Sequence, residues 1–356
     1  MEVADITAFF ELKGRFVTAT PITTGHINST YKVQTTQANY ILQKINSEIF
    51  QDIEALTSNV LRITKHLAQK ASETSNFTLR ALLTKDQLGY HKTADGSYWR
   101  MFDYLNNSVS YEVLEHREQA QILGKAFATY QKQLLDLPAP QLQETLKDFH
   151  NTPLRTTQLR EAIQYNLSGR KRFAQNEIHA LLKLAPEMEI ISSWGAKNKI
   201  PLRSIHQDAK LSNILFHNAT AEYCIIDLDT TMPGYLCYDF GDAVRTGMNT
   251  AAEDEQNLTA VALDLALFKE FTHGYASVAK DFITKNEIDS LLLGVKTITY
   301  EQAIRFLTDF LNGDRYYRVD YAEHNLVRTR VQLKFLQIIL HRYDELATVI
   351  QQAFYK

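Results

Sequence analysis

The sequence predicts an α+β protein with two lobes, a small N-terminal lobe built on an antiparallel sheet and a larger, mainly helical C-terminal lobe. Short apolar runs with a period of two, separated by turn residues, dominate residues 14–105. Beyond Asn106 the apolar period changes to about 3.6, which is typical of amphipathic helices. We therefore expect one domain at residues 1–105 and a second at residues 106–356.

The N-terminal lobe is expected to hold several short strands and one helix. Asp95-Gly96 is a turn signal between two of the strands. Residues 47–70 carry apolar side chains at three- and four-residue steps, which predicts an amphipathic helix packed against the sheet. The candidate strands are residues 16–19, 27–33, 40–45, 79–84 and 98–104.

Helical patterns fill most of the C-terminal lobe. Thr250, with acidic residues at 253–255, is typical of an N-cap and a first helical turn, which predicts a helix running towards Tyr275. The apolar run at residues 223–226 predicts a buried strand that ends at Asp227. The other candidate helices are residues 113–135, 159–172, 178–184, 287–311 and 322–353.

Residues 206–213 follow the pattern H-x-D-x-K-x-x-N, which is typical of a kinase-type phosphoryl-transfer site. Such a transfer needs an acceptor hydroxyl held in line and positive charge near the phosphate oxygens. Asp208 is the candidate residue to contact the acceptor and take its hydroxyl proton. Lys210 is the candidate point charge beside the transferred group. The spacing therefore predicts a catalytic pair, Asp208 and Lys210.

Asn213 and Asp227 offer the oxygen ligands that Mg²⁺ prefers. Asp229 faces the same way as Asp227 if the strand continues, which makes it a second metal ligand or a support for the first. Each fragment alone is explained by a polar turn or a strand end, but together with Asp208 they favour a metal-dependent kinase site. The metal candidates are therefore Asn213, Asp227 and Asp229.

A second acidic motif, Asp239-Phe240-Gly241, matches the string that carries the metal aspartate in protein kinases. It lies beyond the turn at Pro233-Gly234, however, and this turn has already left the predicted strand. We therefore interpret Asp239 as a structural residue that ties its segment to the catalytic loop.

These motifs resemble those of a known superfamily. His206-Gln207-Asp208, Asn213, residues 226–229 and Tyr238-Asp239 resemble the aminoglycoside phosphotransferases and choline kinases, small-molecule kinases with a protein-kinase-like fold. The resemblance covers nearly the whole chain and is closest to the N-acetylhexosamine 1-kinases. It implies ATP- and Mg²⁺-dependent phosphorylation of the anomeric hydroxyl of N-acetylglucosamine or N-acetylgalactosamine. The matching stretches are residues 25–31, 40–43, 226–230, 232–234, 239–242, 305–307 and 323–330.

The loop before the second strand is expected to cover the nucleotide phosphates. Gly25 allows a close approach of the backbone, and successive amides, including that of His26, can point at a phosphate. Asn28 and Thr30 are candidate side-chain contacts. An ordinary hairpin loop is the alternative, because one glycine among polar residues is a weak signal.

The third strand departs from the usual kinase pattern, in which a lysine holds the α- and β-phosphates. The position of that lysine falls on Gln43, and Lys44 points to the opposite face if the strand is regular. Gln43 would then face the nucleotide as a neutral donor, unless a bulge turns Lys44 inward. The replacement for the lysine stays unassigned.

The end of the fifth strand is the expected hinge between the lobes. Its backbone can read the adenine edge of the nucleotide, so the identity of its side chains says little about nucleotide choice. The candidate hinge contacts are Met101, Asp103 and Leu105.

The segment between the last two helical patterns gathers aromatic and basic residues at positions 315–318. Planar aromatic faces and forked donors commonly hold sugars, although surface aromatics in a helix–helix loop explain the segment equally well. The resemblance adds Arg305, Tyr317 and Thr231 as sugar contacts.

The composition favours a small-molecule partner. The formal net charge is -3, and 38 basic and 41 acidic residues are interspersed rather than grouped, which argues against nucleic acid or an anionic membrane as a partner. We expect a cytoplasmic protein, since the start resembles no secretion signal and Cys224 and Cys237 suggest no disulfide. A monomer or a weak homodimer is expected.

Two other functions compete with this prediction. The first is a kinase for another small alcohol, such as choline, ethanolamine, a different sugar or an aminoglycoside. The second is a catalytically silent nucleotide-binding module, which the missing third-strand lysine supports and the intact Asp208, Asn213 and Asp227 oppose. A protein kinase is disfavoured because its glycine-rich and A-P-E motifs are missing from the sequence.

Overall fold

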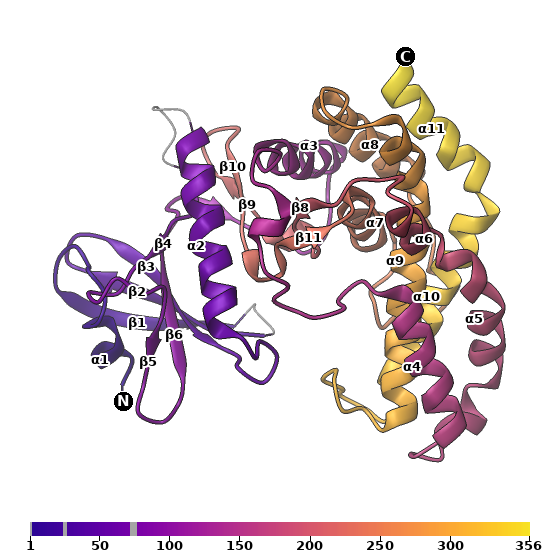
Figure 1. Ribbon diagram of the computed structural model, residues 1–356, viewed down its shortest axis with the longest axis horizontal. Helices are drawn as coiled ribbons and strands as arrows, with labels where there is room; N and C mark the ends of the chain where they lie inside the picture. The colour runs from indigo at the N-terminus through magenta and orange to yellow at the C-terminus, as the bar shows by residue number, and fades with distance from the viewer. Residues whose placement is uncertain (1, 24–26, 72–76) are drawn as a thin grey trace. The chain divides into compact units, whose positions relative to one another are not determined.

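The computed structural model describes residues 2–23, 27–71 and 77–356 (Figure 1). The chain divides into two compact units. The first unit comprises Met1–Tyr111, Gln133–Lys147 and Ser212–Pro233, and the second comprises Glu112–Lys132, Asp148–Leu211 and Gly234–Lys356. The first unit thus contains two segments, Gln133–Lys147 and Ser212–Pro233, that lie beyond the domain boundary predicted after residue 105. The assignment of nucleotide binding to one domain and the acceptor site to the other stays a prediction.

The predicted α+β class is confirmed, with an N-terminal antiparallel sheet and a helical C-terminal region. The sheet has the strand order β1-β2-β3-β6-β4, and β5 pairs with β6. The strands of this sheet and the two helices of the same region are α1 (Val3–Thr7), β1 (Phe16–Ile22), β2 (Ser29–Thr35), β3 (Asn39–Ile45), α2 (Ile53–Lys70), β4 (Ala81–Leu82), β5 (His91–Lys92) and β6 (Tyr98–Asp103).

Alternation along the strands gives this sheet two different faces. On one face Leu42 and Met101 are completely buried in a core that also contains apolar residues of α1. On the opposite face Ile45 packs against α2. Gln43 and Arg100, which pair across β3 and β6, share this second face. Polar side chains therefore lie on the side of the sheet that α2 covers.

A smaller sheet in the first unit carries the predicted buried strand. Its order is β10-β9-β7, formed by β7 (Ser108–Val109), β9 (Ile214–His217) and β10 (Tyr223–Ile225). The strand does not continue through Asp229, so the condition under which Asp229 would face the same way as Asp227 is not met. Asp227 has a left-handed backbone with φ 58°, and the short helix η4 (Leu228–Thr230), which packs against α2, begins directly after it.

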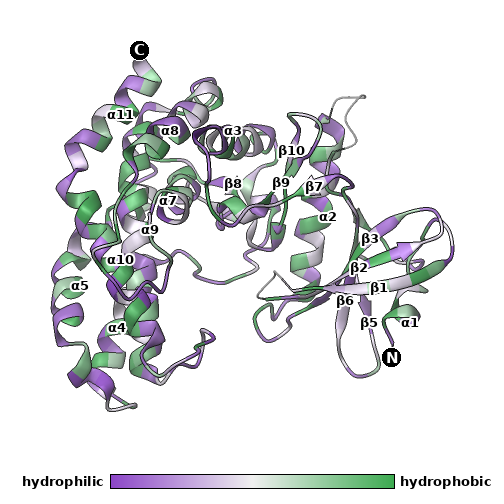
Figure 2. Cartoon of the chain, turned by 180° about the vertical axis from the view of Figure 1, so that it is seen from behind, coloured by the Kyte–Doolittle hydropathy of each residue, from purple (hydrophilic) through white to green (hydrophobic). Residues whose placement is uncertain are grey.

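The second unit is organised around α9 (Lys285–Asn312), whose residues form a core with apolar side chains of α4, α5 and α10. Figure 2 shows both hydrophobic and hydrophilic residues on these three surrounding helices, as expected for helices with one face in a core. The helices are α3 (Arg117–Gln133), α4 (Thr152–Tyr165), α5 (Gln175–Met188), α6 (Ile190–Ala196), α7 (Leu236–Gly247), α8 (Leu265–Ala279), α10 (His324–His341) and α11 (Tyr343–Tyr355). Shorter elements of the chain are η1 (Ala139–Gln141), η2 (Arg170–Phe173), β8 (Arg203–Ile205), η3 (Leu211–Asn213) and β11 (Met232–Gly234).

Several helices begin at residues other than those predicted, and the helices expected from Thr250 and from residue 159 differ the most. The helix expected from Thr250 is wrong over its first half, because the Thr250 hydroxyl donates to Ala260 O in a non-helical segment. Asp264 is the actual N-cap of α8, and its carboxylate accepts from two backbone amides of the first turn. The helix expected at residues 159–172 starts earlier, because Asn151 caps α4.

The two cysteines are free and buried. Burial raises the pKa of each thiol, Cys224 and Cys237, to about 12, as expected for small apolar-packed side chains rather than reactive thiols. Within the described part of the chain, no helix is long and apolar enough to cross a membrane.

Candidate active site

Asp208 and Lys210, the predicted catalytic pair, lie together in the second unit just after β8. Lys210 Nζ is 2.9 Å from Asp208 Oδ2, and the two side chains are 34% and 29% exposed. The amide of Asp208 donates to His206 Nδ1 at 3.2 Å. The loop therefore holds both functional groups side by side and keeps them accessible to a ligand.

The buried Asp239 holds this loop through hydrogen bonds to its backbone. It is completely buried in α7, and its carboxylate accepts the backbone amides of Gln207 at 2.7 Å and His206 at 3.1 Å. Gln131 Nε2 donates to the same carboxylate at 2.8 Å. Burial raises the pKa of Asp239, although His206 and the donors oppose this shift. These contacts support the structural role predicted for Asp239.

A buried hydrogen bond between His150 and Glu301, which sequence reasoning missed, also supports the loop. His150 Nδ1 is 2.9 Å from Glu301 Oε1, and His150 Nε2 is 3.3 Å from Gln207 O, so the imidazole connects α9 to the residue before Asp208. Burial raises the pKa of Glu301, but His150, Arg305 and Thr152 outweigh it, and the net shift is downward. No local motif marks His150 and Glu301, which are 151 residues apart.

We expect Glu301→Gln to destabilise the protein by about 1–3 kcal/mol at pH 7, because it removes a buried charged hydrogen-bond partner. The pKa of Glu301 is depressed in the folded state, so its stabilising contribution is present above the unfolded value and is lost as the pH falls through the folded value. The difference in Tm between variant and wild type should therefore shrink below about pH 4.5. Thermal unfolding between pH 3 and pH 7 measures this, and a constant difference contradicts the assignment.

The metal candidates Asn213 and Asp227 lie in the first unit. The backbone carbonyl of Asn213 accepts from Ile226 N at 2.9 Å, which places Asn213 beside the residue that precedes Asp227. Asp227 is exposed, and its left-handed backbone is one that Asp tolerates better than most residues. Among the described residues, no three His, Cys, Asp or Glu side chains are grouped to hold a metal ion. One carboxylate and an amide oxygen nevertheless fit Mg²⁺ bound to a nucleotide, because phosphates and water supply its other ligands.

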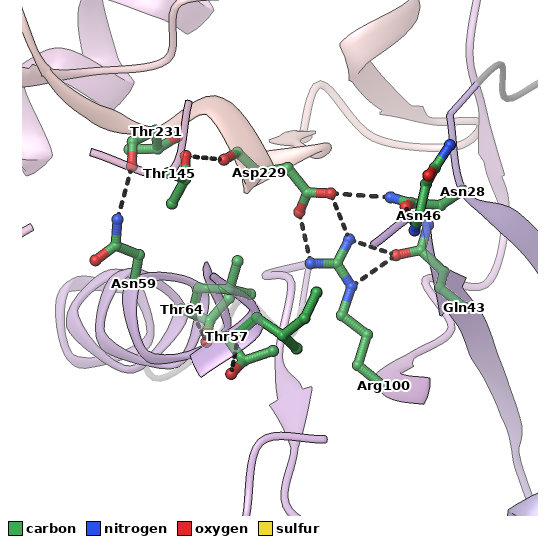
Figure 3. Close-up of polar contacts among 12 residues, drawn as sticks. Asn28, Gln43, Asn46, Thr57, Asn59, Thr64, Arg100, Thr145, Asp229 and Thr231 are labelled. Atoms are coloured by element: carbon green, nitrogen blue, oxygen red, sulfur yellow. Dashed lines mark hydrogen bonds and ion pairs between the residues drawn. The ribbon is translucent and has the colours of Figure 1, made fainter. Parts of the chain in front are cut away.

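Asp229 has different surroundings from those predicted. It is buried in η4, and its two carboxylate oxygens accept from Arg100 Nη1 at 2.5 Å and Nη2 at 2.8 Å (Figure 3). Asn28 Nδ2 also donates to Asp229 Oδ2 at 2.9 Å. Its assignment as a metal ligand relied on a strand that ends before Asp227, and its carboxylate is bonded to protein donors instead.

Gln43 is likewise bonded to protein. β3 keeps an unbroken register with both neighbours, so no bulge turns Lys44 inward, and Lys44 is exposed. Gln43 Oε1 accepts from Arg100 Nε at 3.0 Å and Nη2 at 2.8 Å, and Gln43 Nε2 donates to Thr30 at 3.1 Å. Sequence reasoning missed Arg100. The alignment of Gln43 with Arg100 across β3 and β6 is the signal that could have identified it.

The other predicted nucleotide contacts belong to the phosphate loop and the hinge. Gly25 and His26 lie outside the described residues. The Met101 side chain packs into the sheet core, and Met101 lies between Leu42 of β3 and Leu82 of β4. The amide of Asp103 donates to Arg80 O, and burial raises the pKa of the Asp103 carboxyl. Leu105 is buried. The hinge assignment stays a prediction.

A cavity of about 390 Å³ in the second unit contains two of the three predicted sugar contacts. Arg305 and Tyr317 both line it, and the Arg305 guanidinium lies 5.7 Å from the Tyr317 ring centre and 5.3 Å from that of Phe149. Thr231 is completely buried in the first unit and does not line this cavity. Other lining residues are Arg155, Glu161, Asp309 and Tyr316.

Solved structures of known proteins share the fold of this chain. The spectinomycin phosphotransferase APH(9)-Ia, solved with ADP and spectinomycin, has a TM-score of 0.57 at 14% identity, over 99% of this chain and 97% of that one. A microcompartment-associated aminopropanol kinase has a TM-score of 0.61 at 15% identity, over 97% of each chain. A choline kinase from Cryptosporidium parvum has a TM-score of 0.57 at 11% identity, over 98% of this chain and 94% of that one.

At these identities the likeness concerns the fold, and it agrees with the observed sheet and helices. The sequence itself matches the model of the phosphotransferase enzyme family, APH, over residues 18–276. That range includes most of the antiparallel sheet, the Asp208 loop and the Asp227 turn. The chain therefore belongs to the phosphotransferase enzyme family, APH.

Proposed function

We propose that this phosphotransferase transfers the γ-phosphoryl group of ATP to the anomeric hydroxyl of N-acetylglucosamine or N-acetylgalactosamine. The observation that carries the acceptor class is the aromatic and arginine-lined cavity in the same unit as Asp208. Family membership supports the phosphoryl transfer, and the sequence resemblance supports the particular sugars.

Each side chain has a separate task in the proposed reaction. Asp208 accepts the proton of the anomeric hydroxyl while the sugar oxygen forms its bond to the γ-phosphorus, and the bond from that phosphorus to the bridging oxygen of ADP breaks. Lys210, beside Asp208, offsets the negative charge on the transferred group. Asn213 and Asp227 would hold Mg²⁺, which when bound supplies positive charge to the phosphate oxygens.

The charges around the cavity favour a neutral acceptor over a cationic one. Arg155 and Arg305 both line it, and within the described residues neither guanidinium has a carboxylate within 4.0 Å. The Asp309 carboxylate is occupied by the backbone amides of residues 315–317 and by Asn325 Nδ2. Glu301, which interacts electrostatically with both guanidinium groups, and Glu161, which also lines the cavity, offset part of this charge, but a cationic group placed directly beside the two arginines would still meet like charge.

The same groups suit an N-acetylhexosamine. Guanidinium groups can donate to adjacent hydroxyls or to the acetamide carbonyl. Tyr316 and Tyr317 both line the cavity, and aromatic rings commonly contact the apolar side of a sugar ring. Tyr316 is exposed, whereas the Tyr317 ring packs against Phe306. This pattern supports a sugar over choline or ethanolamine.

A panel of acceptors tests the proposal. Purified protein is incubated with Mg-ATP and N-acetylglucosamine, N-acetylgalactosamine, glucose, choline, ethanolamine or an aminoglycoside, ADP release is measured, and NMR locates the phosphate. We expect turnover with one or both N-acetylhexosamines and phosphate at C1. Turnover with choline alone would favour an amino-alcohol kinase, and background ADP release with every acceptor would favour a silent module.

We expect Arg305→Met to raise the acceptor KM by about tenfold or more, because the loss of a charge-assisted hydrogen bond amounts to about 1.5–3 kcal/mol. The KM for Mg-ATP should stay near the wild-type value. Arg318→Met is a matched control, since the Arg318 side chain is 94% exposed and does not line the cavity. An unchanged acceptor KM in Arg305→Met would show that the acceptor binds elsewhere.

A further inference from the structure

A polar network in the first unit connects the antiparallel sheet to the turn that follows the candidate metal ligand. Thr30, Gln43 and Arg100 lie opposite one another on β2, β3 and β6, and each is hydrogen-bonded to the next. Arg100 then bonds to Asp229 in η4 with two nearly parallel hydrogen bonds (Figure 3). The network therefore joins three strands to η4 through one guanidinium.

The pair is buried, so its geometry is tightly constrained. The side chains of Arg100 and Asp229 are each 4% exposed. Burying two charges is expensive unless their hydrogen bonds are well made, and here Nε, Nη1 and Nη2 of Arg100 all donate. Asn28, whose Oδ1 accepts from Asn46 N, completes the contacts to Asp229. Such a connected network specifies one arrangement of the segments that it joins.

The segment held in this way carries Asp227. Asp229 lies two residues after Asp227, within a single helical turn. The backbone carbonyl of Asp229 accepts from Thr145 Oγ1 at 2.7 Å, so η4 is held through its main chain as well as through its side chain. Any shift of Asp229 would be passed to Asp227 over a very short length of chain.

In protein kinases a lysine of the third strand pairs with a glutamate of the helix that follows, and no such pair takes this role here. Lys44 is exposed on β3 and Glu54 is exposed on α2. The inward polar side chains of α2 are neutral: Thr57 donates to Ile53 O, and Asn59 donates to Gln143 O. Figure 3 shows that Asn59 also donates to Thr231 O. Arg100 is therefore the cation that links the sheet to η4, among the residues that the structure describes.

We propose that Arg100 is a positioning residue that acts through Asp229 to set the affinity of Asp227 for Mg²⁺. This inference rests on the proposed role of Asp227 in the phosphotransferase reaction. Four hydrogen bonds from Arg100 go to Gln43 and Asp229, and the Arg100 side chain is 4% exposed, which argues against Arg100 as a phosphate ligand in place of the missing lysine. Its charge is used to hold the metal-binding turn.

The test compares Arg100→Met, Asp229→Asn, the double variant and Arg100→Lys. For each protein, ADP binding is titrated by calorimetry without metal and then across a series of Mg²⁺ concentrations. We expect both single variants to raise the Mg²⁺ concentration for half-maximal enhancement by about tenfold or more, while metal-free ADP affinity stays within about twofold. The double variant should be no worse than the more severe single variant, because the two residues act as one unit.

Other outcomes overturn the proposal. If Arg100→Met weakens metal-free ADP binding about tenfold, Arg100 is a direct phosphate ligand. If the effects of the two single variants add in the double variant, the residues act independently. Unchanged Mg²⁺ dependence in every variant would show that the pair is only structural.

Controls separate these outcomes from misfolding and from an error in the proposed acceptor. Thermal unfolding reports folding, and the double variant leaves no single buried charge unpaired. Arg100→Lys keeps the charge but not the paired hydrogen bonds, and it should restore part of the Mg²⁺ affinity lost in Arg100→Met. The pair Arg330 and Glu177 of the second unit, 2.6 Å apart, provides a matched control as Arg330→Met/Glu177→Gln, with unchanged Mg²⁺ dependence. Because ADP binding needs no acceptor, an inactive acceptor panel leaves this test intact.

Discussion

Asp208→Asn is expected to lower kcat by about 10² to 10⁴, while Mg-ATP affinity stays near the wild-type value. The substitution keeps the shape of the side chain but removes the carboxylate that takes the proton of the acceptor hydroxyl. The loop should keep its structure, because its anchors are the buried Asp239 and His150 rather than the Asp208 carboxylate. The effect is therefore expected on the chemical step.

Two features of the reaction set the size of this loss. The anomeric hydroxyl of a free sugar is more acidic than an ordinary alcohol, because the ring oxygen withdraws charge, and this moves the expected loss towards 10². Positioning would then contribute more of the rate than proton transfer. Steady-state kinetics with separately measured Mg-ATP affinity distinguish the two, because loss of a transition-state interaction lowers kcat and kcat/KM together. If the variant keeps more than about a tenth of the wild-type kcat, Asp208 is not the base.

The fold could be predicted because its signals are local. The apolar period changes near Asn106, and apolar residues recur every three or four positions in residues 47–70. Both patterns arise because one face of each strand or helix is buried. The error at Thr250 shows the limit of such signals. A cap residue with an acidic turn occurs there, but the apolar face that packs as α8 begins only after Asp264. Packing, and not the cap alone, decides where a helix begins.

The site divides in the same way between local and distant contacts. The spacing of Asp208 and Lys210 predicted their proximity, because two residues of separation in a loop keep side chains near each other. The partners of Asp229 could not be found in this way, since Arg100 is 129 residues away in the sequence. The left-handed backbone of Asp227 was equally hidden, and it turned Asp229 away from the predicted strand. The register between β3 and β6 places Arg100 opposite Gln43, and a correct prediction of this register would have identified Arg100.

Asp227→Ala is expected to abolish Mg²⁺-dependent turnover without unfolding the protein. Asp227 is exposed, so its loss leaves no buried cavity. Alanine in a left-handed backbone costs about 1–2 kcal/mol, which should lower Tm only slightly. Asp227→Asn avoids most of this strain, because Asn tolerates the same backbone, and it should show the same loss of metal dependence. Turnover and ADP binding are both measured across a Mg²⁺ series.

Asp239→Ala, in contrast to Asp227→Ala, should mainly lower the stability of the protein. It removes the acceptor for the amides of His206 and Gln207 and for Gln131 Nε2, all within a buried region. Each donor left without a partner costs about 1–3 kcal/mol, so we expect a loss of several kcal/mol and a clear fall in Tm. Comparing melting curves with Mg²⁺-dependent ADP binding for both variants distinguishes the two roles. A variant of Asp239 that melts like wild type yet loses metal-dependent nucleotide binding would move the metal site from Asp227 to Asp239.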